Sequence, residues 1–452
     1  MEIFQTEIPP QPIKGLRFSK EVWGWAIYDF ANTIFSMNIL TLYFAGWVII
    51  DHRLEDIWYS LTFSGSMLLV AASMPVLGAI SDVSGKKKTY LLLLTLGCIL
   101  ATFSLGIIAR LKITASLELT LVLIAFALAN YCYEGGLVFY NAMLPEVSHH
   151  RKMGQISGLG VALGYLGAIA GMLLVLPFVK GKIPLFSAPG KDQAFIPTAF
   201  FFLLFSLPTF LWVKQHRHHG AAKLRIRAAF QSVWKDLRAT KKYPGVLRFL
   251  ISDFMFEDAI ATVILFMAVY TQAVMGFGEG EKTLLFAIST TSAAVGSLAC
   301  GWVTDRIGPK NTLSIVVWGW IITLLLVVLT ASRTFFWFLG SLTGIFLGST
   351  WTTSRPLLAH LVPKEKLGQF FGLYSLSGRA AAIIGPLLWG TVVLYCKKDS
   401  AFVNMLNDLT GAMGVPFSES TLQTIQYRLA VLALAAMMAL GWIFYRKVPD
   451  KR

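Results

Sequence analysis

The sequence is poor in charge for its length. Only 14% of its 452 residues are Asp, Glu, Lys or Arg, whereas a soluble domain carries about 25%. Hydrophobic residues make up 56% of the chain and recur in blocks of about 20, the length that crosses a bilayer as a helix. Such blocks lack the alternation expected for a barrel of strands. The sequence therefore predicts an integral, multi-pass membrane protein of the all-α class.

Cysteine is also scarce, and its spacing argues against a disulfide framework. The four cysteines are Cys98, Cys132, Cys300 and Cys396. They form no Cys-x-x-Cys pair and three lie in apolar segments, so we expect small buried side chains. The run His216, His218 and His219 lies in a basic loop, where imidazoles are more often solvated than metal-bound. No metal site is predicted.

Motifs of several enzyme classes are missing as well. The sequence has no Walker A motif, no H-E-x-x-H pair and no nucleophile elbow. Their absence disfavours an ATP-driven pump and a membrane hydrolase. We predict neither an enzymatic activity nor a cofactor.

Hydropathy along the chain predicts about twelve spans. Their approximate limits are 22–50, 57–81, 89–110, 117–143, 154–179, 195–213, 246–274, 282–303, 311–331, 334–360, 368–395 and 423–446. The termini and the even-numbered gaps between spans are rich in Lys and Arg, whereas the odd-numbered gaps are poor. By the positive-inside rule both termini are cytoplasmic, in a plasma (inner) membrane. The net charge of +15 then reflects topology, and no nucleic-acid partner is predicted.

A basic gap after the sixth span divides the chain into two sets of six. We predict a cytoplasmic N-terminal segment at 1–21, a first six-helix bundle at 22–213, a cytoplasmic linker at 214–245, a second six-helix bundle at 246–446 and a cytoplasmic tail at 447–452. In the linker, Leu224, Phe230, Val233, Trp234 and Leu237 recur at near-helical spacing between basic residues. This pattern indicates an amphipathic helix on the inner leaflet.

An internal repeat relates the two sets of six. Asp29-Phe30 in the first span recurs as Asp253-Phe254 in the seventh, and GAISDVSGKK (Gly78–Lys87) recurs as GWVTDRIGPK (Gly301–Lys310). Because each copy has an even number of spans, both copies have the same orientation in the membrane, related by an axis along its normal.

The repeated segments resemble the signature G-x-x-x-D-[RK]-x-G-[RK]-[RK] of the major facilitator superfamily, although they depart from it at Val83 and Pro309. The resemblance covers the whole chain. It implies two pseudo-symmetric six-helix bundles around a cavity lined by spans 1, 4, 7 and 10. We expect the repeated segments to act as conformational latches, because a carboxylate at a helix end can bind the backbone N–H groups of a neighbouring helix. The latch residues are Gly78, Asp82, Gly85, Lys87, Gly301, Asp305, Arg306 and Gly308.

A narrower resemblance lies in the first span. GWAIYDFANTIFS, at Gly24–Ser36, is similar to the opening of the UMF1/Atg22-like branch, whose fungal members are vacuolar amino-acid exporters. This resemblance makes an amino acid the first guess for the substrate.

Polar residues inside the spans are candidates for solute or proton binding, because a charge in the bilayer costs about 3 kcal/mol or more. These candidates are Asp29, Asn32, Asn130, Tyr133, Glu134, Asp253, Glu257, Asp258, Arg355 and Arg379. Asp253 and Glu257 share a helix face, where neighbouring carboxylates oppose each other's ionisation, so one is a candidate proton carrier. An acid paired with Arg355 is a candidate gate.

Two observations limit this interpretation. The alternative is that these residues form structural polar pairs, which hold helix ends together and bind no solute. Proton-coupled members of the superfamily often carry an arginine in span 4, and none occurs here, which weakens the inference of proton coupling.

Span 5 carries glycines at three- and four-residue spacing, from Gly154 to Gly171, which predicts close helix packing rather than a nucleotide loop.

These observations predict a monomeric secondary transporter in the lipid bilayer. It would move a small polar or charged organic solute by alternating access, with an amino acid as the first guess and proton coupling left open. The alternative is a membrane receptor or scaffold that retains the transporter fold without transport. The long outward loop at 397–422 suggests no role.

Overall fold

The computed structural model describes residues 19–84, 86–111, 113–148, 153–185, 189–215, 226–243, 245–362, 367–412 and 417–450. Over these ranges all regular structure is helical, with no strand. Within them, twelve long helical segments form the bundle. Ten are long and apolar enough to cross a membrane, and the other two, α9 (Val246–Met275) and α12 (Arg333–Leu361), reach 30 and 29 residues. The predicted all-α fold of about twelve spans is therefore confirmed.

The bounds of the spans follow the chain order. In the first half they are α1 (Lys20–Phe35) with η1 (Ser36–Tyr43), α2 (Phe44–Gly46) and η2 (Trp47–Asp51), then α3 (Asp56–Ser84), α4 (Lys87–Ile108), α5 (Ala115–Ser148), α6 (Met153–Val179), and η3 (Lys191–Ala194) with α7 (Phe195–Trp212). In the second half they are α9, α10 (Glu279–Ile307), α11 (Pro309–Leu329), α12, the pair α13 (Leu367–Ala380) and α14 (Ile384–Tyr395), and α17 (Ile425–Tyr445). Shorter elements are α8 (Ile226–Ala239), η4 (Thr240–Lys242), α15 (Ala401–Ala412) and α16 (Glu419–Gln423).

Local sequence signals explain several of these ends. α9 lies between two glycines in the left-handed region, Gly245 (φ 92°) and Gly276 (φ 65°), and glycine takes that conformation without a Cβ penalty. Ser332 caps α12 by accepting a hydrogen bond from the Phe335 backbone N–H at 3.3 Å. Pro309 is the first residue of α11, where its missing N–H costs no helical bond. The predicted span limits agree closely; the largest difference is α5, which extends to Ser148 beyond the predicted 143.

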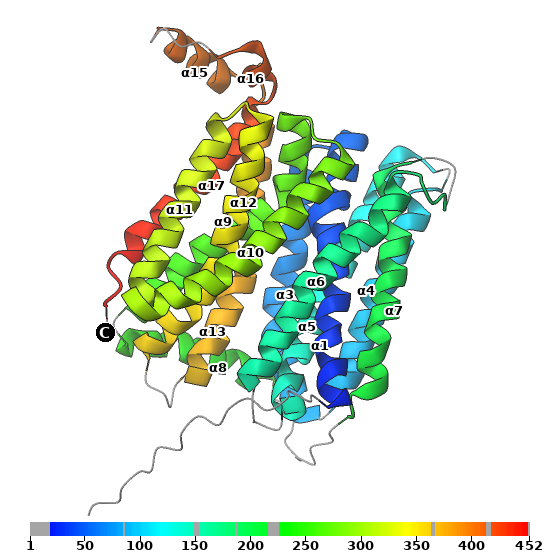
Figure 1. Cartoon of the computed structure of the whole chain (residues 1–452), viewed down its shortest axis with the longest axis vertical. Helices are drawn as coiled ribbons and strands as arrows, with labels where there is room; N and C mark the ends of the chain where they lie inside the picture. The colour runs from blue at the N-terminus through cyan, green and yellow to red at the C-terminus, as the bar shows by residue number, and fades with distance from the viewer. Residues whose placement is uncertain are drawn as a thin grey trace, which may run out of the picture.

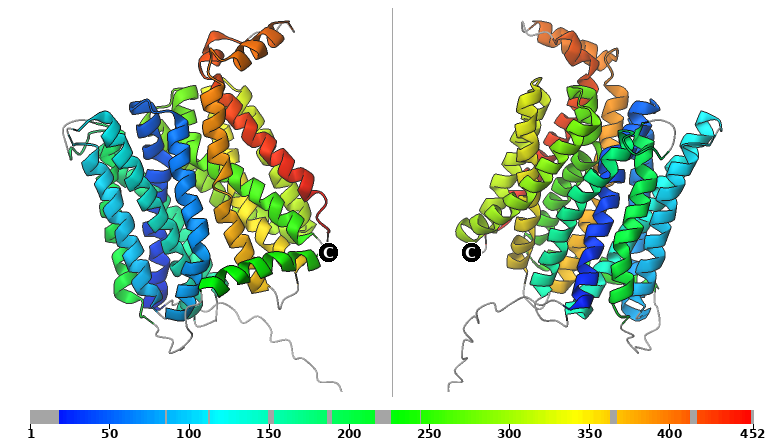
Figure 2. Two further views of the ribbon diagram at one scale, coloured as in Figure 1. Left: turned by 180° about the vertical axis from the view of Figure 1, so that it is seen from behind. Right: turned by 45° about the vertical axis from the view of Figure 1, so that its right-hand side comes forward.

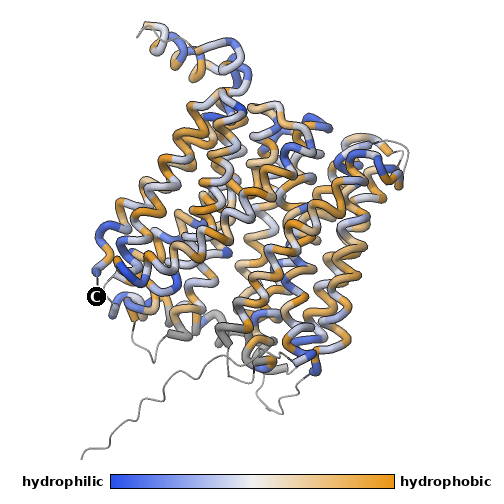
Figure 3. Tube along the Cα trace, in the orientation of Figure 1, coloured by the Kyte–Doolittle hydropathy of each residue, from blue (hydrophilic) through white to orange (hydrophobic). Residues whose placement is uncertain are grey.

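The two halves stand side by side, and the start of α1 and the end of α17 lie towards the same end of the bundle (Figure 1). We call this the terminal end and the other the opposite end. Helices α15 and α16 project from the opposite end, whereas α8 lies across the terminal end at a steep angle to the spans (Figure 2). Apolar residues cover much of the length of the spans, with polar residues gathered towards the ends (Figure 3). Exposed Leu211, Leu298 and Leu329 illustrate this lateral surface, which a bilayer covers.

Two salt bridges hold the projecting α15–α16 segment: one joins it to the bundle, and the other lies within the segment. Lys397 Nζ lies 2.5 Å from Glu55 Oε1, and Lys398 pairs with Glu419. The hydrogen bond between them raises the pKa of Lys398 and lowers the pKa of Glu419, so this pair stays ionic at neutral pH.

The glycines of span 5 pack α6 against α1, as the sequence predicts. A Cβ built on Gly167 would lie 2.2 Å from the carbonyl oxygen of Phe30, and one on Gly160 would lie 2.8 Å from Asp29 Oδ2. Only glycine permits so close an approach. The stripe therefore fixes the position of the acid-bearing helix α1.

Two irregularities in the spans were not predicted. The first span is π-helical at η1 and η2, a geometry that often marks functional sites. The predicted span 368–395 is interrupted between α13 and α14. Pro386 explains the interruption, because its ring clashes with the carbonyl four residues earlier and it donates no hydrogen bond. Asp258 Oδ1 compensates by accepting the free backbone N–H of Gly385 at 2.8 Å.

Candidate solute cavity between the two halves

A cavity of about 850 Å³ lies between the two halves. We call it the solute cavity. Its lining comes from α1, α5 and α6 of the first half and from α9, α10, α12 and α13 of the second. The expected cavity-lining spans 1, 4, 7 and 10 correspond to α1, α5, α9 and α12, and all four contribute.

Five predicted candidates supply the charged side chains among the described lining residues. They are Asp29, Glu134, Glu257, Arg355 and Arg379. Two carboxylates come from the first half, whereas one carboxylate and both guanidinium groups come from the second. Charges of both signs therefore face one another across the division between the halves.

One ion pair crosses the cavity. Arg379 Nη1 donates to Glu134 Oε2 at 2.7 Å and to the Glu134 carbonyl oxygen at 2.7 Å. We expected a gate between an acid and Arg355, so the pair that forms is a different one. Arg379 reaches Glu134 because α13, although outside the four expected lining spans, borders the cavity beside α5.

Arg355 is free to bind a ligand. It is exposed to the cavity and forms no ion pair or hydrogen bond with any other described residue. Glu257, the acid of its own half, accepts a hydrogen bond from Trp351 Nε1 at 3.0 Å. An unpaired guanidinium beside aromatic and carboxylate groups is a ready site for an anionic group.

Asp253 lies behind the cavity wall, one helical turn from Glu257. Its side chain is fully buried, and neither of its carboxylate oxygens accepts a hydrogen bond from a described residue. A buried carboxylate without a partner is neutralised rather than left charged.

Asp29 occupies the facing wall. Its Oδ1 accepts a hydrogen bond from Asn32 Nδ2 at 3.3 Å, and Thr33 Oγ1 donates to its carbonyl oxygen at 2.6 Å. Trp25 and Tyr140 stack beside it with ring centroids 4.5 Å apart. Asn32 therefore orients the Asp29 carboxylate, and it is itself buried.

Like Asn32 and Asp253, three further predicted candidates lie outside the described lining. Asn130 is buried and donates to Ser66 Oγ at 2.7 Å. The Tyr133 ring packs on Phe35 with centroids 5.1 Å apart. Asp258 of α9 is buried and accepts the Gly385 backbone N–H at the start of α14, with its Oδ2 unpartnered among the described residues. Their placement favours packing and helix capping over direct solute contact.

The first latch falls largely outside what the structure describes. Gly85 and the side chain of Asp82 are not among the described parts, and Gly78 is placed only as a residue of α3. Lys87 is described: its Nζ donates to the Ala142 carbonyl at 3.0 Å and lies 2.8 Å from Glu146 Oε1. Lys87 thus ties the start of α4 to α5.

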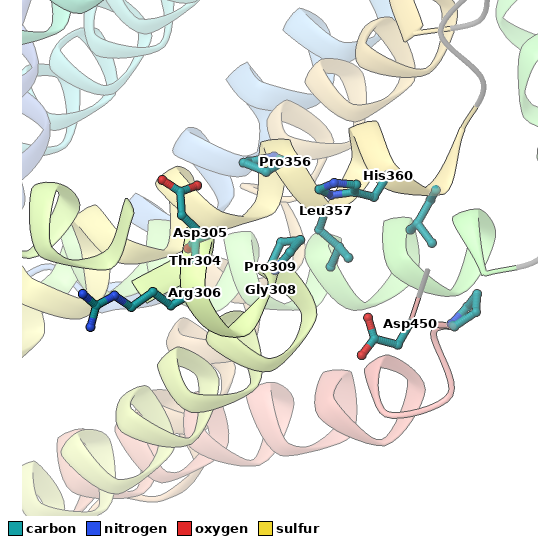
Figure 4. Close-up of a pocket in the computed structure, with 11 residues that line it drawn as sticks. Thr304, Asp305, Arg306, Gly308, Pro309, Pro356, Leu357, His360 and Asp450 are labelled. Carbon is teal, nitrogen blue, oxygen red and sulfur yellow. The ribbon is translucent and has the colours of Figure 1, made fainter. Parts of the chain in front are cut away.

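The second latch borders a pocket of about 350 Å³ at the terminal end (Figure 4). Gly308, with φ 85°, makes the turn between α10 and α11. The Arg306 guanidinium carbon lies 3.4 Å from the centre of the Trp302 ring, while Asp305 is exposed and forms no ion pair with a described residue. Gly301 faces only Thr352 of α12. The latch role of Asp82 and Asp305 stays a prediction.

Buried charges join the halves at the opposite end. Lys191 Nζ lies 2.5 Å from Asp51 Oδ1 and 3.7 Å from Glu279 Oε1. Lys282 Nζ lies 2.8 Å from the same Glu279 oxygen and 2.7 Å from Gln272 Oε1. Asp51 and Lys191 belong to the first half, and the other three to the second. We call these five residues the opposite-end cluster.

Sequence reasoning missed this cluster, because hydropathy placed Lys191 in the gap before the sixth span and Lys282 at the edge of the eighth. The two side chains are only 6% and 1% exposed. The available signal was that each lysine lies at the start of an apolar span with an acidic residue close by in sequence. The opposite end is therefore held together by buried ion pairs.

A second, apolar chamber of about 290 Å³ adjoins the solute cavity. Thr33, Tyr165 and Trp351 line both spaces. The π-helical segment η1 contributes Met37 and Leu40 to the chamber. The path between the halves thus passes from a charged space to an apolar one.

Comparisons with known proteins agree with this architecture. Residues 58–406 match the family model described as "Vacuole effluxer Atg22 like". The MFS-type transporter YxiO of Bacillus subtilis, described as uncharacterized, is 25% identical over 398 residues, 86% of this chain and 91% of that protein. Autophagy-related protein 22 of Kluyveromyces lactis is 23% identical over 390 residues, 78% of this chain and 76% of that protein.

Solved structures show the same fold. The nucleoside transporter NupG superposes with a TM-score of 0.67 at 13% identity, covering 94% of this chain and 99% of that one. A bacterial homologue of the human lysosomal transporter Spinster, inward-facing and occupied, gives 0.65 at 14% identity, covering 94% and 95%. Because the Atg22-like family model spans most of the sequence, and because the relatives and structural neighbours are transporters, the chain belongs to the Atg22-like family of the major facilitator superfamily and is a multi-pass membrane transporter.

Proposed function

We propose that this protein is a secondary active transporter of a small zwitterionic organic solute, with an amino acid as the first candidate. The observation that carries the proposal is the free Arg355 facing the solute cavity, with Asp29 on the wall of the other half. A guanidinium binds a carboxylate in a two-pronged geometry. The Asp29 carboxylate is suited to an ammonium group.

A solute held in this way would contact both halves at once. Arg355 is on α12 of the second half and Asp29 is on α1 of the first. Only a solute with both charges satisfies both residues, so its binding would draw the halves together at the terminal end. Such differential binding is what alternating access requires. The Lys and Arg distribution supports a cytoplasmic terminal end. We place the protein, as a monomer, in the plasma membrane.

Protons are the coupling ions that the cavity wall supports. Asp253 and Glu257 lie one turn apart on α9, and Asp253 is buried without a partner among the described residues. Two carboxylates this close form a coupled pair that can hold a proton. This pair offers a proton site without the span-4 arginine of other proton-coupled members.

The alternative is a receptor or scaffold without transport. An unpaired Arg355 and a buried Asp253 cost folding energy, and no structural bond of theirs among the described residues offsets that cost. That balance favours a transporter whose charges contact a solute and a proton.

The test is solute exchange in proteoliposomes that contain the purified full-length chain. We expect counterflow of at least one zwitterionic amino acid, loss of that exchange in Arg355→Gln, and partial recovery in Arg355→Lys. Arg333→Gln is the matched control, since Arg333 pairs with Glu281 on the surface, outside the described cavity lining. Exchange that survives in Arg355→Gln would overturn the binding role. If no amino acid of a panel is exchanged, and none raises the unfolding temperature, the receptor or scaffold is favoured.

A further inference from the structure

Helix α8 carries an unpartnered cationic and apolar surface at the terminal end. Trp234 is 58% and Leu237 is 40% exposed, and they lie three residues apart on one helix face. Lys235 and Arg238 are exposed beside them, and the Arg238 guanidinium carbon lies 5.3 Å from the centre of the Trp234 ring. Two more exposed lysines, Lys241 and Lys242, follow in η4.

The charge of this segment is one-sided. Residues 226–243 contain five basic residues and one acidic residue. In the opposite-end cluster, cations are paired with acids, whereas the described cations of α8 and η4 form no salt bridge with a described residue. An anionic partner outside the chain would match the charge of this segment.

The place of α8 restricts what that partner is. The helix lies across the terminal end at a steep angle to the spans (Figure 2), which is the orientation of a helix at a membrane surface. Exposed Trp favours the depth of the lipid headgroups, and Lys and Arg beside it favour their phosphates. A soluble anion would account for the cations but not for the exposed Trp234 and Leu237.

We propose that α8 and η4 form a binding surface for anionic phospholipid headgroups, and that this binding favours the conformation in which the solute cavity is open at the terminal end. The proposal does not depend on which solute is carried. It goes beyond membrane insertion because it requires a negatively charged lipid surface.

The contacts of α8 with both halves provide the conformational effect. The helix packs on α3 of the first half and on α13 of the second. After η4, the Tyr243 ring packs edge-on against Phe370 of α13 with centroids 5.2 Å apart. Lipid that holds α8 flat at the membrane surface therefore holds the ends of α3 and α13 in their present positions. Closing the terminal end would require α8 to shift against both helices.

The binding experiment uses the full-length chain in detergent with added phosphatidylglycerol or phosphatidylcholine. We expect phosphatidylglycerol alone to raise the unfolding temperature, because a ligand that binds only the folded state stabilises it. Each Lys or Arg removed is expected to weaken the affinity about fivefold, so Lys235→Gln/Arg238→Gln should bind about 25-fold more weakly. The stabilisation should also fall at high salt.

The matched control is Lys180→Gln/Lys182→Gln, a pair of exposed lysines at the opposite end, which should retain the wild-type response. Lys241→Gln/Lys242→Gln is a second α8-region pair, for use if the first does not fold in phosphatidylcholine. An unchanged phosphatidylglycerol response in both linker variants would overturn the proposal. So would an equal response to phosphatidylcholine, or to inorganic phosphate at the same ionic strength.

The conformational effect is tested in nanodiscs. Ser375 is exposed and lines the solute cavity, so Ser375→Cys in a Cys396→Ser background reports access to it. We expect the labelling rate by a charged maleimide to rise with the phosphatidylglycerol fraction in wild type and in the Lys180/Lys182 variant, and to be insensitive to it in the Lys235/Arg238 variant. A rate that ignores lipid charge in all three would refute the conformational part.

Discussion

The Arg379 guanidinium in the second half donates hydrogen bonds at 2.7 Å to both the carboxylate and the backbone carbonyl oxygen of Glu134 in the first half. Both side chains are less than one-fifth exposed. The two bonds fix the distance between α5 and α13 at the depth of the solute cavity. This pair is therefore the inter-half contact that any closure of the terminal end must keep or rearrange.

Breaking this pair should change both stability and conformation. Charge-assisted bonds of this kind couple their partners by about 0.5–3 kcal/mol. We expect Glu134→Gln and Arg379→Gln each to lower the unfolding temperature, and the double variant to lower it by less than the sum of the two. A double-mutant cycle on thermal unfolding in detergent measures the coupling. Strictly additive effects would mean that the bond contributes nothing to the folded state.

The opposite-end cluster should hold that end closed. Removal of one partner from a buried ion pair leaves the other charge uncompensated and costs about 3–5 kcal/mol. In Lys282→Met, Glu279 would keep only the longer contact to Lys191, at 3.7 Å, of its two lysine contacts in the cluster. The weakened cluster would disfavour the closed arrangement, so the opposite end would open more often. Ser289→Cys, in the apolar chamber, should be labelled faster by an impermeant reagent applied from the opposite side.

Arg333→Gln is the control for that experiment, because it removes a cation of the same end from an exposed pair with Glu281. It should leave the labelling rate at the wild-type value. Equal rates in Lys282→Met and wild type would show that other contacts keep this end closed.

Steric contact between α1 and α6 gives a prediction that needs no charge. A Cβ at Gly167 would lie 2.2 Å from the Phe30 carbonyl oxygen, a backbone atom that cannot rotate away. Gly167→Ala should therefore destabilise the protein by about 1–3 kcal/mol. A Cβ added at Gly372 of α13 would meet no heavy atom within 4 Å, and Gly372→Ala should be neutral or stabilising by up to about 1 kcal/mol. Thermal unfolding of the two variants makes the comparison, and equal effects would contradict it.

Sequence patterns were sufficient for the spans and for the charged residues of the cavity. Apolar length sets the spans, and the high cost of a charge in the bilayer makes Asp29, Glu134, Glu257, Arg355 and Arg379 conspicuous without any structure. The pairing was not predictable in the same way. Whether Glu134 meets Arg379 or Arg355 depends on how two distant helices are rotated, and hydropathy carries no information on that rotation.

The remaining differences have local causes. The π-helical segment η1 of the first span packs against α6 and α9, and no propensity scale registers such tertiary contacts. The interruption before α14 had a signal in Pro386, but proline is tolerated in many membrane helices. The buried Lys191 and Lys282 looked like loop charges because burial at a span end depends on the opposing half. Each of these features follows from contacts between distant parts of the chain.

The last prediction separates solute binding from proton coupling among the acids of the cavity. Asp29 is oriented towards the cavity by Asn32, whereas Asp253 is buried behind the wall without a hydrogen-bond partner among the described residues. An amide has the shape of a protonated carboxyl group but cannot titrate. Asp253→Asn should therefore fold normally, keep counterflow of the solute, and lose accumulation driven by a pH gradient.

Asp29→Asn should behave differently, because it removes the negative charge proposed to bind an ammonium group. We expect it to weaken counterflow and gradient-driven uptake together, with a higher KM for the solute. Both modes are measured in the same proteoliposomes, with Glu134→Gln as a third variant. If Asp253→Asn loses counterflow and gradient-driven uptake equally, Asp253 takes part in solute binding rather than in proton coupling. If both modes survive in Asp29→Asn and Asp253→Asn, the two acids serve the structure alone, because neither the solute nor the proton would then depend on their charge.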